Sequence, residues 1–191
     1  MFVFILWMSV FCNYSAAATD SLELGFEANF GGDFRLPSSE GAELSLRDLR
    51  GKVVLMTFGY TSCPDACPIT MGLLDSLYKR LGADADKVQV LFASFDPERD
   101  DANRLKEYLA FFDSRYIGLT GSLSQVEQLA DQYGVFFLKR TIDSAAGYTF
   151  AHSNHVYLLD QQGKLRKFYD LNEEFESLHN GIQYLIRQES R

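Results

Sequence analysis

Hydrophobic and polar positions along the chain fall into runs of two kinds. Residues 51–60 (GKVVLMTFGY) and 87–96 (KVQVLFASFD) are continuous apolar stretches, typical of strands that are buried on both faces. Residues 69–82 (ITMGLLDSLYKRLG) repeat apolar side chains at helical spacing and end at a glycine. Residues 96–113 offer an aspartate cap, a proline at the first helical position and acids in the first turn, so they predict a second helix.

The second half of the chain continues the alternation of strands and helices. Residues 116–122 (YIGLTGS) predict a short strand that leads into a helix over 122–134. Residues 150–160 (FAHSNHVYLLD) and 164–170 (KLRKFYD), joined by a Gln-Gly turn, predict a hairpin. The pattern over 172–188 predicts a closing helix.

This order of elements defines the fold class. A βαβαβα run followed by ββα indicates an α/β fold with a parallel core, to which the terminal hairpin adds antiparallel strands. We therefore expect a mixed central sheet with helices on both faces. Residues 20–50 are expected to form an N-terminal hairpin extension. Two cysteines directly after the first central strand make the fold thioredoxin-like.

The N-terminus resembles a targeting segment. Residues 1–18 are an uncharged apolar run that ends in small residues, which predicts a signal peptide or, if it is retained, a short membrane anchor. The remaining residues, 19–191, are predicted to form one thioredoxin-like domain. We expect the protein to be periplasmic or otherwise exported, and to be attached to a membrane only through the N-terminal segment.

Composition and charge exclude several classes of function. The chain has 191 residues, 47% hydrophobic residues and a formal net charge of −8, without a basic run, so a nucleic-acid partner is not expected. It contains no glycine-rich phosphate loop and no GxSxG motif, so nucleotide binding and serine hydrolysis have no support.

The candidate chemistry is concentrated in residues 57–72 (TFGYTSCPDACPITMG). Two of the chain's three cysteines, Cys63 and Cys67, lie here. A disulfide between them would close a very small loop and add little to stability, which leaves a redox dithiol and a metal site as alternatives. Both cysteines are expected near a helix N-terminus, with the regular helix starting near Pro68. The helix dipole there favours the thiolate, which is both the nucleophile and the metal ligand.

A histidine near the dithiol favours the metal alternative. Of the chain's three histidines, His179 falls in the closing helix, while His152 and His155 flank the start of a strand, where at most one can reach a given site. The loop before that strand lacks the proline that redox thioredoxins place there. Two thiolates and one imidazole suit Cu(I) and can also hold Cu(II), whereas structural zinc needs a fourth ligand.

Four segments, GKVVLMTFGYTSCPDACP, SFDPERD, GLTGS and HSNHVYLLDQQGKL, resemble the Sco (SenC/PrrC) family in order and spacing. The resemblance covers roughly residues 30–189. It implies a copper protein of thioredoxin fold that helps to assemble the copper centre of cytochrome c oxidase, as a metallochaperone, a thiol reductase or both. By position the copper ligands would be Cys63, Cys67 and His152; His152 precedes Tyr157 by the interval that the family uses.

The resemblance leaves two functional hypotheses. In the first, the protein is an extracytoplasmic metallochaperone that passes copper to the copper subunit of the oxidase or to another copper or thiol protein. In the second, Cys63 and Cys67 are the catalytic dithiol of a periplasmic thiol–disulfide reductase that binds no metal stably. The chain departs from the family at Ala151, where an aspartate usually precedes the ligand histidine and could orient it.

Overall fold

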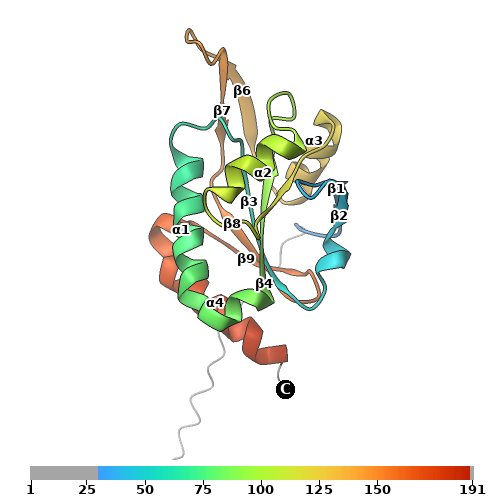
Figure 1. Ribbon diagram of the computed structural model, residues 1–191, viewed down its shortest axis with the longest axis vertical. Coiled ribbons are helices and arrows are strands. Elements are labelled where there is room, and N and C mark those ends of the chain that lie inside the picture. Colours follow the sequence, from blue (N-terminus) through green and yellow to red (C-terminus); the bar gives the residue numbers. More distant parts are fainter. Residues whose placement is uncertain (1–29, 190–191) are drawn as a thin grey trace, which may run out of the picture.

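The computed structural model describes residues 30–189 (Figure 1). The predicted leader, residues 1–18, and the first part of the predicted domain lie outside the described residues. None of the helices within this described range is long and apolar enough to cross a membrane.

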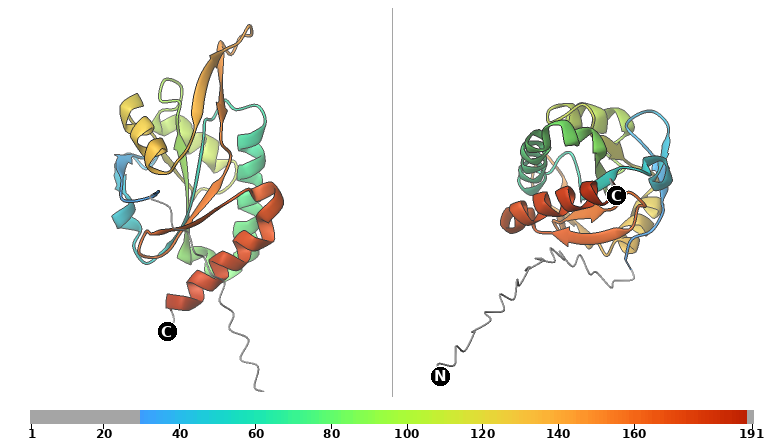
Figure 2. Two further views of the ribbon diagram at one scale, coloured as in Figure 1. Left: turned by 180° about the vertical axis from the view of Figure 1, so that it is seen from behind. Right: turned by 90° about the horizontal axis from the view of Figure 1, so that it is seen from below.

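The described chain contains an α/β body with two small hairpins attached to it (Figures 1 and 2). Its strands are β1 (Arg35–Pro37), β2 (Glu43–Ser45), β3 (Val53–Gly59), β4 (Val88–Ser94), β5 (Ile117–Leu119), β6 (Phe137–Thr141), β7 (Tyr148–His152), β8 (Val156–Leu159) and β9 (Leu165–Tyr169). Its helices are α1 (Ala66–Leu81), α2 (Ala102–Ala110), α3 (Leu123–Gln132) and α4 (Leu171–Glu189), with short 3₁₀ helices η1 (Leu46–Leu49) and η2 (Gly82–Lys87).

The central sheet has the strand order β5-β4-β3-β8-β9. Strands β3, β4 and β5 are parallel, β8 runs antiparallel to β3, and β9 runs antiparallel to β8. Every residue of β3 and β4 is buried, as expected for continuous apolar runs in the middle of a sheet. The predicted mixed sheet and the predicted N-terminal hairpin, β1–β2, are both confirmed.

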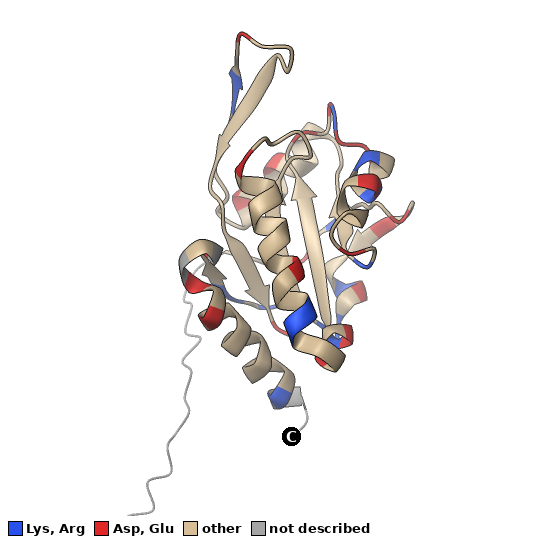
Figure 3. Ribbon diagram, turned by 60° about the vertical axis from the view of Figure 1, so that its left-hand side comes forward, with Lys and Arg blue, Asp and Glu red and all other residues tan. Residues whose placement is uncertain are grey.

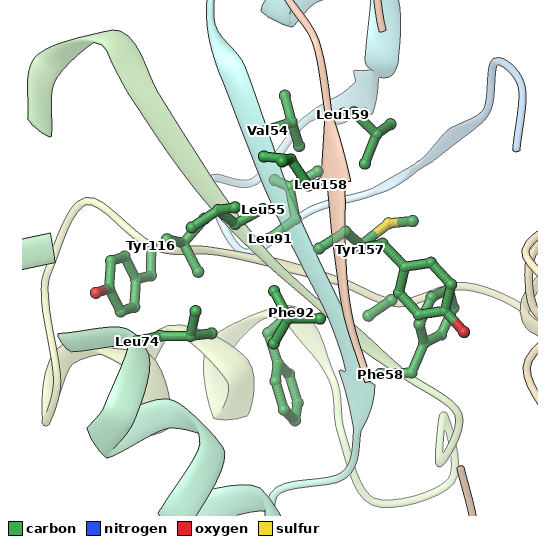
Figure 4. Packing of buried hydrophobic residues seen from close by; sticks show 14 of the residues in the cluster. Val54, Leu55, Phe58, Leu74, Leu91, Phe92, Tyr116, Tyr157, Leu158 and Leu159 are labelled. Carbon is green, nitrogen blue, oxygen red and sulfur yellow. The ribbon is translucent and has the colours of Figure 1, made fainter. Parts of the chain in front are cut away.

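Alternate residues of β3 point to opposite faces of the sheet, as Leu55 and Phe58 do in Figure 4, and helices lie on both faces (Figure 2). On one face the ring of Phe58 lies 6.1 Å from that of Tyr133, which caps α3. On the other face Gly59 packs against Cys67 of α1, and the Phe92 ring lies 5.6 Å from Tyr108 of α2. The thioredoxin-like arrangement predicted from the order of elements is therefore confirmed.

The second helix begins later than the sequence predicts. Its cap is Asp101, whose side chain accepts a hydrogen bond from the Arg104 amide at 2.7 Å, and the helix starts at Ala102. Residues 96–100 form a separate turn instead, in which the Asp96 carbonyl accepts from the amides of Arg99 and Asp100. The prediction that the helix starts at Asp96 was wrong because both aspartates suit a helix cap, and tertiary contacts choose between them.

The predicted strand over residues 150–160 is two strands in different sheets. Strand β8 pairs with β3 in the central sheet, and the β8–β9 hairpin is confirmed. Strand β7 pairs instead with β6, a strand that the sequence analysis did not predict. The β6–β7 hairpin projects beyond the body of the molecule (Figures 1 and 2). It lies at the same end of the sheet as the loop between β3 and α1.

Candidate metal centre

The two cysteines lie where β3 passes into α1. Cys63 is half-buried in the connecting loop, and Cys67 is the second residue of α1 and is buried. The helix begins at Ala66, two residues before the predicted start, with Pro68 as its third residue. A proline fits this position because the first amides of a helix have no partner within it.

Gly59 allows Cys67 to pack against the sheet. A methyl group on Gly59 would lie 2.7 Å from the Cys67 sulfur and 2.9 Å from the Phe92 ring, closer than side chains approach one another. The absence of a side chain at the end of β3 therefore lets the sulfur rest directly on the strand.

His152 reaches the dithiol from the last position of β7. Its Nδ1 lies 2.9 Å from the carbonyl oxygen of Ser153. Because a carbonyl only accepts hydrogen bonds, Nδ1 carries a proton, and Nε2 is the ring nitrogen that faces the dithiol. Nε2 lies 4.0 Å from the Cys67 sulfur, and the ring packs 4.9 Å from that of Phe95.

The structure thus brings together the three residues predicted from the sequence. The ligand atoms of Cys63, Cys67 and His152 all lie within 4.8 Å of one another. No other group of three possible metal-binding residues is found in the described part of the chain. His155 lies elsewhere: its ring packs 5.0 Å from that of Phe168, and its backbone carbonyl accepts a hydrogen bond from Thr57.

The two thiols share one proton unequally. A hydrogen bond from the Cys67 thiol lowers the pKa of Cys63 to about 3, against the opposing effect of burial and with further help from His152 and two backbone amides. The same hydrogen bond and the burial of Cys67 raise the pKa of Cys67. At neutral pH the half-buried Cys63 is therefore the thiolate, and the buried Cys67 holds the proton.

This donor set fits a soft metal ion. Sulfur and nitrogen ligands bind transition metals at about 2.0–2.3 Å, so donors on opposite sides of one ion lie no more than about 4.6 Å apart. Shifts on the order of an ångström would let all three donors bind a single ion. Two thiolates and an imidazole favour Cu(I), and Nε2 of His152 already lies on the side of the sulfurs.

Asp100 supports the site and was overlooked in the sequence. Its carboxylate is fully buried and accepts hydrogen bonds from the backbone amide and hydroxyl of Thr61, two residues before Cys63, at 2.8 and 2.6 Å. A third hydrogen bond comes from the Ser94 hydroxyl at 2.6 Å. The sequence could have indicated this role, because Asp100 follows β4 and the cysteines follow β3, and the carboxyl ends of parallel strands meet at the same edge of a sheet.

The fold and the site together define a thioredoxin-like protein with a dithiol and an imidazole at the first helix N-terminus. The chain belongs to the SCO1/SenC family, whose model matches residues 23–187. It is 34% identical to the mitochondrial SCO1 homolog 1 of Arabidopsis thaliana over 85% of this chain and 48% of that protein. It is 35% identical to the mitochondrial SCO2 homolog of Homo sapiens over 80% of this chain and 58% of that protein. The chain therefore spans about half the length of these two relatives.

Solved structures of the same family superpose on the described fold. ScoI of Bradyrhizobium japonicum, solved with copper bound, matches with a TM-score of 0.75 and 33% identity over 82% of this chain and 99% of that one. ScoI of Arabidopsis thaliana, also solved with copper bound, matches with a TM-score of 0.76 and 34% identity over 83% of this chain and 99% of that one.

Proposed function

We propose that this chain binds copper through Cys63, Cys67 and His152 and serves in the assembly of cytochrome c oxidase. The observation that carries the proposal is the 4.0 Å approach of His152 Nε2 to the Cys67 sulfur, with Nδ1 donating its proton away from the site. Two relatives of similar fold were solved with copper, and BsSco is described as a member of the Sco family of cytochrome c oxidase assembly proteins.

Copper is the cargo of this site. The Cys63 and Cys67 thiolates and the His152 imidazole hold Cu(I), and the same donors accept Cu(II). Cys63 is the half-buried member of the pair, so a thiol of a partner protein can approach the metal from its side. The metal then passes to the partner as the partner's ligands replace those of this chain one by one. The partner is the copper subunit of the oxidase or another copper or thiol protein.

A second function, reduction of a disulfide in a partner protein, is favoured by the lowered pKa of Cys63. The Cys63 thiolate attacks one sulfur of the partner's disulfide, forms a mixed disulfide and releases the other sulfur as a thiolate. Cys67 loses its proton, attacks Cys63 and displaces the second partner thiolate. The partner's disulfide is reduced, and this chain is left with a Cys63–Cys67 disulfide.

The proposed place of action is outside the cytoplasm. Residues 1–18 serve as a signal peptide, or as a short anchor if they are retained, and residues 19–191 act as one domain. The Arabidopsis thaliana SCO1 homolog and the Homo sapiens SCO2 homolog are mitochondrial, and another family member is a lipoprotein from Bacillus anthracis, which supports an exported or membrane-associated protein.

Anaerobic titration of the reduced protein with Cu(I), against a chromophoric competitor, tests the copper function. We expect a 1:1 complex with Cu(I). For the Cu(II) form we expect a thiolate-to-copper charge-transfer band in the absorption spectrum and an EPR spectrum of sulfur-ligated copper. A Cys63→Ser, Cys67→Ser double variant is the control and should bind no copper tightly. Failure of the native protein to bind, together with reversible oxidation of its dithiol, would leave the reductase function in its place.

A further inference from the structure

The turn of residues 96–100, directly after β4, contacts both halves of the candidate metal centre. Asp100 at its end accepts hydrogen bonds from Thr61 and so holds the loop that carries Cys63. The remainder of the turn faces the β6–β7 hairpin, whose strand β7 ends at His152. The same short segment therefore contacts both the loop that carries Cys63 and the strand that carries His152.

Asp96 and Arg99 connect this turn to β7. The Asp96 carboxylate is buried and accepts hydrogen bonds from the Tyr148 hydroxyl, at 2.7 Å, and from Arg99 Nε. The Arg99 guanidinium lies 3.7 Å from the centre of the Tyr148 ring. It also donates to the backbone carbonyls of Ala146 and Tyr148, at 3.4 and 3.3 Å.

A guanidinium suits this position better than an ammonium would. Arg99 uses Nε for the carboxylate, a terminal nitrogen for the β7 backbone and its flat face for the Tyr148 ring. A lysine offers a single point charge and could not make all three contacts at once. Arginine at this position is therefore matched to its surroundings in shape as well as in charge.

The hairpin is joined to the body at a few places, and the turn of residues 96–100 is one of them. Four of the five residues of β6 are exposed, and two-stranded hairpins alone are marginally stable in water. Its contacts with the body besides this turn come mainly from Phe95 and Tyr60. The Phe95 ring stacks on Phe137 at 5.0 Å. Tyr60 packs 5.2 Å from Phe150 and shares a 2.8 Å hydrogen bond with the Thr149 hydroxyl. His152 thus stands on an element whose position depends on a few contacts.

We infer that Arg99 is a positioning residue for copper binding: through Asp96 and Tyr148 it fixes β7 so that His152 meets the dithiol. The inference rests on the proposed copper function. The exposed ion pair between Lys139 and Glu98, 2.7 Å apart, joins the same hairpin to the same turn and provides a matched comparison. Lys139 also lies 3.8 Å from the centre of the Tyr148 ring, so it tests whether any cation at this ring has the same effect. The two side chains of the ion pair are 43% and 63% exposed, so both contacts of Lys139 contribute little.

The test is a double-mutant cycle on Cu(I) affinity, measured by anaerobic competition. Arg99→Gln is expected to weaken binding by about 10- to 100-fold, as the loss of a group that supports a metal ligand does. Lys139→Gln should change it by less than about twofold. In a protein that already carries His152→Ala, Arg99→Gln should weaken Cu(I) binding by less than about a further twofold, because Arg99 acts only through the imidazole.

Amide hydrogen exchange in the metal-free protein gives a second readout. Arg99→Gln should speed exchange in β6 and β7 but not in β3 and β4, whereas Lys139→Gln should leave both unchanged. If Arg99→Gln fails to fold, Tyr148→Phe removes only the hydroxyl that Asp96 accepts and should show a smaller loss of affinity in the same direction.

Four results would overturn the inference or its basis, and they are distinguishable. Native affinity in a folded Arg99→Gln protein would show that Arg99 does not position the ligand. An equal loss with and without His152 would place its effect on the dithiol or on the whole fold. If the native protein binds no copper, the proposed function fails. Slower or unchanged exchange of the β6 and β7 amides in Arg99→Gln would separately show that Arg99 does not anchor the hairpin.

Discussion

At the scale of single residues, Gly59 and His152 shape the candidate metal centre in two different ways. Gly59 contributes by its lack of a side chain, since the Cys67 sulfur occupies the space where a methyl group would lie. His152 contributes by the orientation of its ring, since Nδ1 donates a hydrogen bond to the Ser153 carbonyl and Nε2 faces the dithiol.

The tight contact at Gly59 leads to a prediction. Gly59→Ala should move the Cys67 sulfur, destabilise the protein by about 1–3 kcal/mol and weaken copper binding, because the core at this point has no room for a methyl group. Urea unfolding of the metal-free protein and Cu(I) competition measure the two effects.

Gly72 provides the control for this substitution. It lies within α1, and a methyl group added there meets nothing within 4 Å. Gly72→Ala should leave copper binding unchanged and stabilise the protein by roughly 0.5–1 kcal/mol, since alanine is the better helix former. Equal behaviour of the two variants would contradict the role given to Gly59.

At the scale of elements, α1 provides the electrostatic setting of the dithiol. The helix carries no acidic residue in its first turn and has Lys79 and Arg80 in its last turn, and its charged residues lie in its C-terminal half (Figure 3). The partial positive charge at its N-terminus favours a thiolate near Cys63 and Cys67, and the acid that precedes the helix, the N-cap Asp65, makes no side-chain hydrogen bond to it.

A thiolate on Cys63 at neutral pH is the resulting prediction. Its pKa of about 3 in the folded protein lies below its ordinary value near 9. The thiolate should therefore persist down to about pH 3, and its contribution to the stability of the reduced protein, complete above the ordinary pKa, should be lost as the pH falls through about 3. Ultraviolet thiolate absorbance against pH measures this directly.

The Cys63→Ser variant tells the two thiols apart. Its remaining thiol, Cys67, is buried, and burial raises the pKa of that thiol, so no thiolate should appear at neutral pH. Thiolate absorbance that develops only in the alkaline range in the native protein would disprove the assignment of the shared proton to Cys67.

The elements also show where prediction from sequence succeeds and where it fails. The buried strands and α1 are visible in the sequence because long apolar runs are typical of buried strands, and apolar residues at helical spacing are typical of amphipathic helices. The turn at 96–100 was missed because the run Asp-Pro-Glu fits a helix start equally well. The β6–β7 hairpin was missed because its residues are largely exposed and leave no strong apolar pattern.

At the scale of the whole molecule, the fold brings together ligands that lie far apart in the chain. The dithiol follows β3, and His152 ends β7 shortly before β8, which pairs with β3. Strand topology therefore brings these segments to one end of the sheet, which is why a histidine near the dithiol could be expected from the sequence. The choice of His152 over His155 came from the resemblance to the Sco family. The contacts of Asp96, Arg99 and Asp100 were not predicted, because they depend on side-chain packing between segments.

The central claim is that one imidazole, that of His152, completes a copper site with the dithiol. The most direct test is the Cu(I) affinity of His152→Ala beside that of His155→Ala, with the native protein as reference. We expect the first change to weaken binding by more than about 10-fold, while dithiol exchange with a model disulfide continues, and the second to alter it by less than about twofold. Native affinity in His152→Ala, or an equal loss in His155→Ala, would contradict the claim.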